Sequence, residues 1–139
     1  MTRANFENLR IYQLAETLAD NIWDCTIRWD SFAKDTVGMQ LVRAADSIGA
    51  NIAEGSGRGS SQDYRRFLRI ARRSLYETLH WLRRAYIRKL VTAAQTRELR
   101  AIVTELSPTL NAYLRSVSVT VSRETSHNAK DQGPKIKAR

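Results

Sequence analysis

Long stretches of this sequence contain neither proline nor glycine, the residues that most often end helices and form the turns between strands. Only two prolines and six glycines occur in 139 residues, and three of the glycines lie within five positions of one another. Strands and hairpins need such turn residues at short intervals, whereas long helices do not. The sequence therefore predicts an all-α fold.

Apolar residues recur at helical spacing in four segments. In the first they alternate at spacings of four and three, which is typical of a helix packed against antiparallel neighbours: Ile11, Ala15, Leu18, Ile22, Cys25 and Trp29. The predicted helices span about residues 6–29, 35–55, 60–89 and 95–120. We expect residues 1–122 to form one domain, an antiparallel up-down-up-down four-helix bundle.

Local signals set the expected ends of these helices. Asp35 is a plausible N-cap for the second helix, and Ser60 or Ser61 can cap the third, with Asp63 three residues after Ser60. Gly55 should end the second helix. Pro108 lies inside the fourth, where it removes a backbone hydrogen bond, so we expect a kink there.

The C-terminal region lacks a clear apolar face. Residues 116–122 alternate Ser or Thr with Val, a strand-like pattern, but no second strand is available and we expect a frayed helix end. Residues 123–139 mix Lys, Arg, Asn, Gly and Pro without periodic apolar positions. Because such a segment buries little apolar surface, we expect a disordered basic tail.

Several classes of protein are disfavoured by composition. Cys25 is the only cysteine, so no disulfide can form within the chain, and no apolar leader precedes Glu7. The longest run without Asp, Glu, Lys or Arg is nine residues (106–114), far below the roughly 20 that span a bilayer. We therefore expect a cytoplasmic protein without a membrane-spanning segment.

The positive charge is concentrated in one segment. Residues 58–89 contain ten Lys or Arg and only two Asp or Glu, whereas residues 1–57 carry a net charge of −3. Nine of those ten basic residues are arginine, whose planar guanidinium group binds phosphate oxygens in pairs and stacks on bases. This pattern favours a nucleic-acid partner.

A helical projection of residues 60–89 separates the arginines from the apolar face. It places Arg65, Arg69, Arg72 and Arg83 on one flank with Tyr76, and Arg66, Arg73 and Arg84 on the opposite face near His80. The predicted nucleic-acid-binding residues are Arg58, Arg65, Arg66, Arg69, Arg72, Arg73, Arg83 and Arg84. The alternative is a protein-binding scaffold, in which these arginines are solvated or pair with acidic residues of a neighbouring subunit or a protein partner.

Two apolar residues on this helix lie outside its core stripe. The projection places Ile70 and Trp81 near each other beside the basic face, where a monomer would leave them exposed. A Trp and an Ile at such a position suggest a subunit interface.

No set of residues predicts catalysis. The segment 55–60, Gly-Ser-Gly-Arg-Gly-Ser, resembles a phosphate-binding loop only weakly, because it follows a helix and lacks the Gly-Lys-Ser/Thr motif. Glu77 and His80 have the Glu-x-x-His spacing of di-iron bundles, but such a site needs two of these motifs. Cys25 and His127 have no partner residues nearby in the sequence. We expect a non-enzymatic protein without a metal or cofactor.

Three stretches of the chain carry a family resemblance. They are Phe6-x-x-Leu9, then 40–55 (Gln-Leu-Val-Arg-Ala-Ala-x-Ser-Ile-x-x-Asn-Ile-Ala-Glu-Gly), then 67–77 (Phe-Leu-x-Ile-Ala-x-x-Ser-Leu-x-Glu). This order resembles the bacterial four-helix-bundle family of 23S ribosomal-RNA intervening-sequence proteins, over about residues 6–120.

The resemblance implies an up-down-up-down bundle, a homopentameric ring and no known enzymatic activity. A distant relative of that family, the accessory protein of diversity-generating retroelements, is a basic pentamer that binds nucleic acid. Within the signature, Ser47, Asn51 and Glu54 lie on one side of the second helix, ahead of Gly55. We expect these residues to have a structural role, fixing register by hydrogen bonds across the bundle.

Overall fold

The protein is all-helical. The computed structural model describes residues 5–131, and the side chains of residues 5–117, and contains no strand in that range. Its elements are η1 (Asn5–Asn8), α1 (Arg10–Thr26), α2 (Ser31–Ala33), the π-helical segment η2 (Lys34–Gly38), α3 (Met39–Ser56), α4 (Ser61–Ile87) and α5 (Ala93–Asp131).

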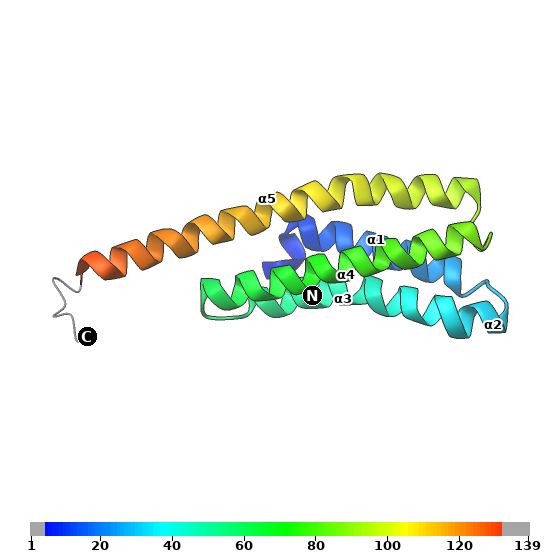
Figure 1. Ribbon diagram of the computed structural model, residues 1–139, viewed down its shortest axis with the longest axis horizontal. Coiled ribbons are helices and arrows are strands. Elements are labelled where there is room, and N and C mark those ends of the chain that lie inside the picture. Colours follow the sequence, from blue (N-terminus) through cyan, green and yellow to red (C-terminus); the bar gives the residue numbers. More distant parts are fainter. Residues whose placement is uncertain (1–4, 132–139) are drawn as a thin grey trace.

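Four long helices form the bundle, and short connections join each one to the next (Figure 1). Helix α1 packs against α3 and α5, and α4 also packs against α3 and α5, the contact between α3 and α4 being the most extensive. The four helices thus surround one core. The C-terminal third of α5 extends beyond the ends of α3 and α4 (Figure 1).

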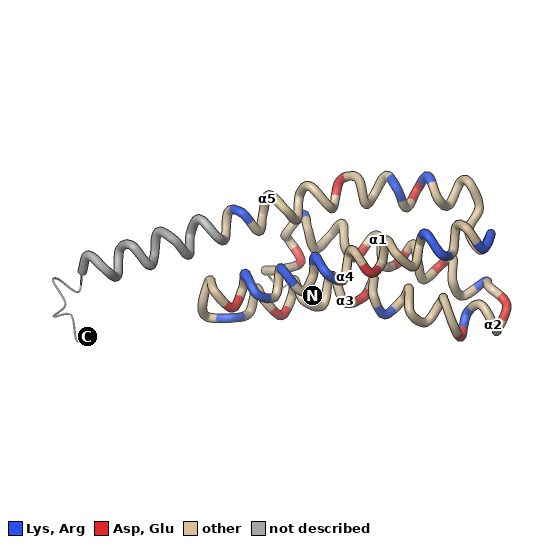
Figure 2. Tube along the Cα trace, in the orientation of Figure 1, with Lys and Arg blue, Asp and Glu red and all other residues tan. Residues whose placement is uncertain are grey.

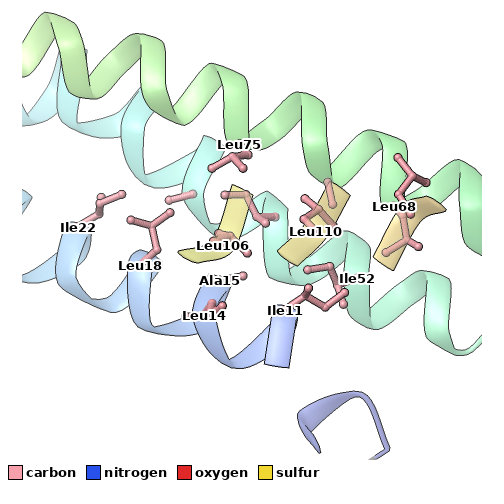
Figure 3. Close-up of a cluster of buried hydrophobic side chains, with 14 of the residues drawn as sticks. Ile11, Leu14, Ala15, Leu18, Ile22, Ile52, Leu68, Leu75, Leu106 and Leu110 are labelled. Carbon is pink, nitrogen blue, oxygen red and sulfur yellow. The ribbon is translucent and has the colours of Figure 1, made fainter. Parts of the chain in front are cut away.

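The core consists of aliphatic side chains contributed by all four helices (Figure 3). The largest of those with no exposed surface are Leu18, Ile22, Ile48, Ile52, Leu68, Leu106 and Leu110. These positions lie on the periodic apolar faces of the sequence, so burial follows the helical repeat. Each fully buried side chain of this kind contributes about 1.5–3 kcal/mol through the hydrophobic effect.

The starts of two helices test the expected caps. Ser60 caps α4, its side chain accepting a hydrogen bond from the Asp63 backbone N–H at 3.1 Å. The expected cap at Asp35 is wrong, because the helical segment begins earlier: the Asp30 side chain accepts from the Ala33 backbone N–H at 3.0 Å. From Ser31 the chain remains helical through α2, η2 and α3.

Two helix ends differ from expectation. Helix α3 ends at Ser56, one residue past Gly55, and α4 ends at Ile87, with Lys89 in the left-handed conformation (φ 61°). The Leu90 N–H donates to the Ala85 carbonyl at 2.9 Å, a bond that closes the end of the helix.

Helix α5 is longer than the sequence predicts. It passes through Pro108 without a break, and Figure 1 shows its axis changing direction in the yellow middle of the helix. It continues to Asp131, so the backbone of residues 123–131 is helical where we expected disorder. No Gly or Pro occurs from 109 to 132, so a helix nucleated on the core can propagate. Residues 132–139 lie outside the described part.

The helices of the structure test the expectation that no segment spans a membrane. Of those described, none combines the length and the apolar character needed to cross a bilayer.

Candidate nucleic-acid interface

The first half of α4 presents its arginines on one surface. Its opposite side is buried in the core through residues such as Leu68, Ala71 and Leu75. A shallow hollow of about 550 Å³, here called the arginine groove, is lined by Gln62, Arg65, Arg66, Arg69, Arg72 and Arg73. In Figure 2 the blue segments recur along this half of α4. Five guanidinium groups therefore share one side of one helix.

This arrangement corrects the predicted split of the arginines. Arg66 and Arg73 were expected on the face opposite Arg65, but all three line the same groove. Neighbouring residues of a helix differ by about 100° around its axis, which is less than half a turn, and long side chains bridge that gap. The arginines form one broad cationic surface instead of two.

Few carboxylates neutralise the arginine groove. Arg66 Nε lies 3.5 Å from Asp63 Oδ1, and Arg72 Nη1 donates to the amide oxygen of Asn111 at 3.3 Å. Within residues 5–117, no carboxylate lies at ion-pair distance from Arg65, Arg69 or Arg73. Their charge is therefore available to a ligand from outside this part of the chain.

Arg58 is held outside the groove. Its Nη2 lies 2.8 Å from Glu54 Oε1, and its guanidinium carbon lies 4.9 Å from the centre of the Phe67 ring. The Arg66 guanidinium lies over the same ring at 4.6 Å. The structure places Arg58 in an ion pair beside the loop between α3 and α4, so its charge is partly neutralised within the chain.

The two predicted arginines near the C-terminal end of α4 also lie outside the groove. Arg83 lines a different hollow, between α4 and α5, in which most lining residues are apolar. Arg84 is half-buried, and its buried Nε has no hydrogen-bond partner among the described residues. Neither belongs to the surface formed by Arg65 and its neighbours.

One aromatic residue follows the arginine groove on the same side of α4. Tyr76 lies three residues after Arg73 and four after Arg72, positions that share a helix face. Its side chain is 55 % exposed. An exposed ring beside several arginines can stack on an unpaired base while the arginines contact phosphates.

The predicted interface pair is less exposed than expected. Ile70 and Trp81 are both half-buried within the single chain, and Trp81 packs against the core cluster. Its Nε1 lies 3.4 Å from Glu77 Oε1, and its ring meets His80 edge-on with centroids 4.8 Å apart. Both side chains are thus partly covered within the single chain instead of fully exposed, and their place in a subunit interface stays a prediction.

Three of the four family-signature residues, Ser47, Asn51 and Gly55, lie between α3 and α4, whereas Glu54 is exposed. Ser47 Oγ and Ser74 Oγ are 2.9 Å apart, and the Asn51 side-chain amide donates to the Ser47 carbonyl at 2.8 Å and to its Oγ at 3.0 Å. A Cβ added to Gly55 would lie 2.7 Å from the Phe67 Cβ. These contacts hold the two helices together and fit a structural role.

The described residues with reactive side chains are either buried, hydrogen-bonded or without the neighbours that a catalytic or metal site needs. Burial, and to a lesser extent Asp24, raises the pKa of the Cys25 thiol, which disfavours the reactive thiolate. Burial and the 2.8 Å hydrogen bond to Tyr113 raise the pKa of Tyr64. Among the described side chains, no three His, Cys, Asp or Glu residues gather closely enough to hold a metal ion.

Exposed apolar residues that we did not predict gather at the opposite end of the bundle from the arginine groove. They belong to the end of α1, to α2, to the start of α3 and to the end of α4: Trp23, Ile27, Phe32, Met39, Tyr86 and Ile87. The signal was present in α1, where Trp23 and Ile27 lie off the periodic apolar face.

The fold and the arginine groove define a class, the basic four-helix proteins with one cationic helix face. Comparison with known proteins identifies the family within this class. The model of the 23S rRNA-intervening sequence protein family matches residues 7–112, and the chain belongs to that family.

A solved structure supports the same fold. The crystal structure of a protein of unknown function from the S23 ribosomal protein family of Bacteroides thetaiotaomicron is similar with a TM-score of 0.66 and 24 % sequence identity. The match covers 75 % of this chain and 97 % of that protein. The search of curated proteins gave no match.

Proposed function

We propose that this protein binds the sugar–phosphate backbone of nucleic acid through the arginine groove, without catalysing a reaction. The observation that carries the proposal is the convergence of five arginines on one side of α4, of which Arg65, Arg69 and Arg73 have no carboxylate at ion-pair distance within residues 5–117. Arginine clusters of this kind bind phosphate by releasing counterions.

The length of the arginine groove suits a polynucleotide. Arg65 and Arg73 are eight residues apart, or about 12 Å along the helix. Phosphates follow one another at about 3.4 Å of axial rise along one strand of a duplex, so the groove can contact several of them. A single bound phosphate would need only two or three of these arginines.

The family suggests which nucleic acid to test first. Its name refers to an intervening sequence of 23S rRNA, so RNA is the first ligand to examine. The exposed ring of Tyr76 beside the groove favours strands with unpaired bases. We further propose a cytoplasmic protein whose helices alternate up and down and whose subunits assemble as a homo-oligomer, with five subunits as the expectation from the resemblance.

The competing function is a protein-binding scaffold. In that case the arginine groove would meet acidic residues of a partner or of a neighbouring subunit, and nucleic acid would not compete for it. A measurement of the affinity for nucleic acid distinguishes the two functions, because only the first requires the arginine groove to bind it.

The test is fluorescence anisotropy with labelled RNA and DNA, single-stranded and duplex, at one low salt concentration. We expect Arg65→Ala/Arg69→Ala/Arg72→Ala to weaken binding by at least about tenfold, because three phosphate contacts are lost. The matched control is Arg28→Ala/Arg43→Ala/Arg97→Ala, which removes three exposed arginines from other surfaces. Equal affinities for the two triple variants would contradict the assignment of the site.

A further inference from the structure

Two opposite faces of the bundle are complementary in charge. The first is on α1 and its C-cap residue Ile27. Glu16, Asp20, Trp23 and Ile27 follow one another at spacings of four, three and four residues and therefore form one stripe. Glu16 and Asp20 line a shallow hollow between α1 and α3 together with Asp46. Burial and the nearby Asp20 raise the pKa of Asp46, as expected where acidic groups gather. We call this stripe the acidic face.

The acidic face also exposes large apolar side chains. Trp23 is 54 % exposed and Ile27 is 48 % exposed. Two such side chains one helical turn apart leave apolar area in water, and tryptophan is among the residues that contribute most to protein interfaces.

The second face is the hollow between α4 and α5, here called the apolar groove. It has a volume of about 260 Å³ and is lined mainly by Leu79, Leu82, Tyr86, Leu99 and Val103. Arg83 and Arg100 complete its lining, together with Val91 and Thr96. The apolar groove thus combines apolar surface with two positive charges. It is complementary to the acidic face, which combines apolar side chains with two carboxylates.

These two faces cannot meet within one chain. Because α1 contacts α3 and α5, and α4 contacts the same two helices, the seam between α1 and α3 lies opposite the seam between α4 and α5. The end of α1, the end of α4 and the start of α5 lie at the same end of the bundle (Figure 1). Two copies placed side by side would therefore bring one face of each kind together at the same height.

We propose that the acidic face of one subunit packs into the apolar groove of a second copy, with Trp23 and Ile27 on the groove floor and Asp20 beside Arg83 and Arg100. This inference rests on the proposed self-assembly and specifies which surfaces form it. Such a contact is head-to-tail, so each added subunit leaves one free face until a ring closes. It also assigns Arg83 to assembly, whereas we had predicted it to bind nucleic acid.

The charges favour a second copy over another occupant. Each face supplies what the other needs, since carboxylates meet guanidinium groups and exposed aromatic rings meet apolar side chains. The two faces contain a tryptophan (Trp23), a tyrosine (Tyr86) and two arginines. These residue types are enriched among the residues that contribute most to protein–protein interfaces. Like charges would repel if two acidic faces or two apolar grooves met instead.

The test uses two variants, each with one damaged face. Asp20→Lys/Trp23→Lys damages the acidic face, and Tyr86→Glu/Arg100→Glu damages the apolar groove; Trp23 and Tyr86 are more than half exposed, so the helices should tolerate these changes. By light scattering after size-exclusion chromatography, we expect the wild type to be oligomeric and each variant alone to have the mass of one chain. Mixed in equal amounts, the variants should form particles of at least two chains, because one intact face of each kind is present.

The control carries the charge change of Asp20→Lys/Trp23→Lys on another surface. Glu98→Lys/Ala101→Lys adds three positive charges to α5 at exposed positions outside both faces, and it should keep the wild-type mass. If a lysine or glutamate variant fails to fold by circular dichroism, Trp23→Ala and Tyr86→Ala replace the two variants.

Three results would overturn the proposal: a monomeric wild type, variants that keep the wild-type mass, or a mixture that stays monomeric. The mass measurement is independent of nucleic-acid affinity, so a failure of this inference can be told apart from a failure of the arginine groove.

Discussion

Gly55 lies where α3 packs closely against α4. An added Cβ would lie 2.7 Å from the Phe67 Cβ and 3.0 Å from the Tyr64 Cδ2, both closer than carbon atoms normally approach. The Phe67 Cβ is fixed to its backbone and cannot move without shifting the helix. A glycine at this position therefore allows the two helices to pack closely before the chain turns.

We predict that Gly55→Ala destabilises the protein. Alanine gains about 1 kcal/mol over glycine in a helix, but the overlap with Phe67 should cost more, giving a net loss of about 1–2 kcal/mol in the free energy of unfolding. Urea denaturation measures this change. Gly59→Ala is the control, because nothing lies within 4 Å of its added Cβ, and its stability should stay within about 0.5 kcal/mol of the wild type. A stabilised Gly55→Ala variant would refute the close approach.

A second prediction concerns the exposed ring of Tyr76. If bases stack on it, Tyr76→Ala should weaken single-stranded RNA binding by about 1–3 kcal/mol while leaving duplex binding nearly unchanged. Tyr76→Phe keeps the aromatic face and should bind as the wild type does. Anisotropy with both kinds of strand measures the difference. Equal losses for single-stranded and duplex ligands in Tyr76→Ala would argue against stacking.

Among the elements, the helices follow the apolar periodicity of the sequence, whereas their ends follow local contacts. The apolar face of residues 60–89 matches the buried side of α4 at Leu68, Ala71 and Leu75 because burial repeats with the helix. The cap at Asp30 was missed because Asp35 also satisfies the rule for an N-cap, and only the fold shows which carboxylate meets a free N–H.

The passage of α5 through Pro108 agrees with the predicted helix, whereas its C-terminal extent was not predicted. Pro108 removes the backbone N–H that would donate to the Thr104 carbonyl, and the helix nevertheless continues. Packing of Leu106 and Leu110 on the core holds both sides of this position. The cost of one lost hydrogen bond is thus offset by tertiary contacts that a sequence rule does not include.

Helix α4 ends with a residue under local strain, which gives a third prediction. Lys89 adopts φ 61°, a conformation that costs a residue with a side chain about 1 kcal/mol relative to glycine. Lys89→Gly should therefore raise the free energy of unfolding by up to about 1 kcal/mol, seen as a higher melting temperature. Lys34→Gly, a change in the middle of a helical segment, should lower it instead. A melting temperature lowered by Lys89→Gly would contradict the left-handed helix end.

The arginines of the candidate site were identified from the sequence, but their grouping was not. Their density on residues 58–89 is visible in composition. Which of them share a surface depends on the reach of long side chains and on partners such as Glu54 for Arg58, and the structure separates that residue, Arg83 and Arg84 from the groove. The apolar groove combines residues from α4 and α5, so no single periodic segment reveals it, whereas the acidic face lies along α1 and could have been read from its spacing.

At the scale of the whole molecule, the arginine groove and the exposed apolar residues occupy different ends. The arginine groove lies on the first half of α4, and the exposed apolar residues gather where α1 ends and α3 begins. A molecule arranged in this way can assemble through one end and keep the other available for a charged ligand. Assembly would then place several arginine grooves on one particle and increase its affinity for a long strand.

The most direct test of nucleic-acid binding at the arginine groove is the salt dependence of RNA affinity for the wild type and for Arg65→Ala/Arg69→Ala/Arg72→Ala. Each phosphate contact contributes a slope of about −0.7 for a single strand to a plot of log K against log salt concentration. We predict a steep negative slope for the wild type and a slope shallower by about two units for the variant, since three contacts are removed. No binding at low salt, or equal slopes for the two proteins, would contradict the account and favour a protein partner for the arginine groove.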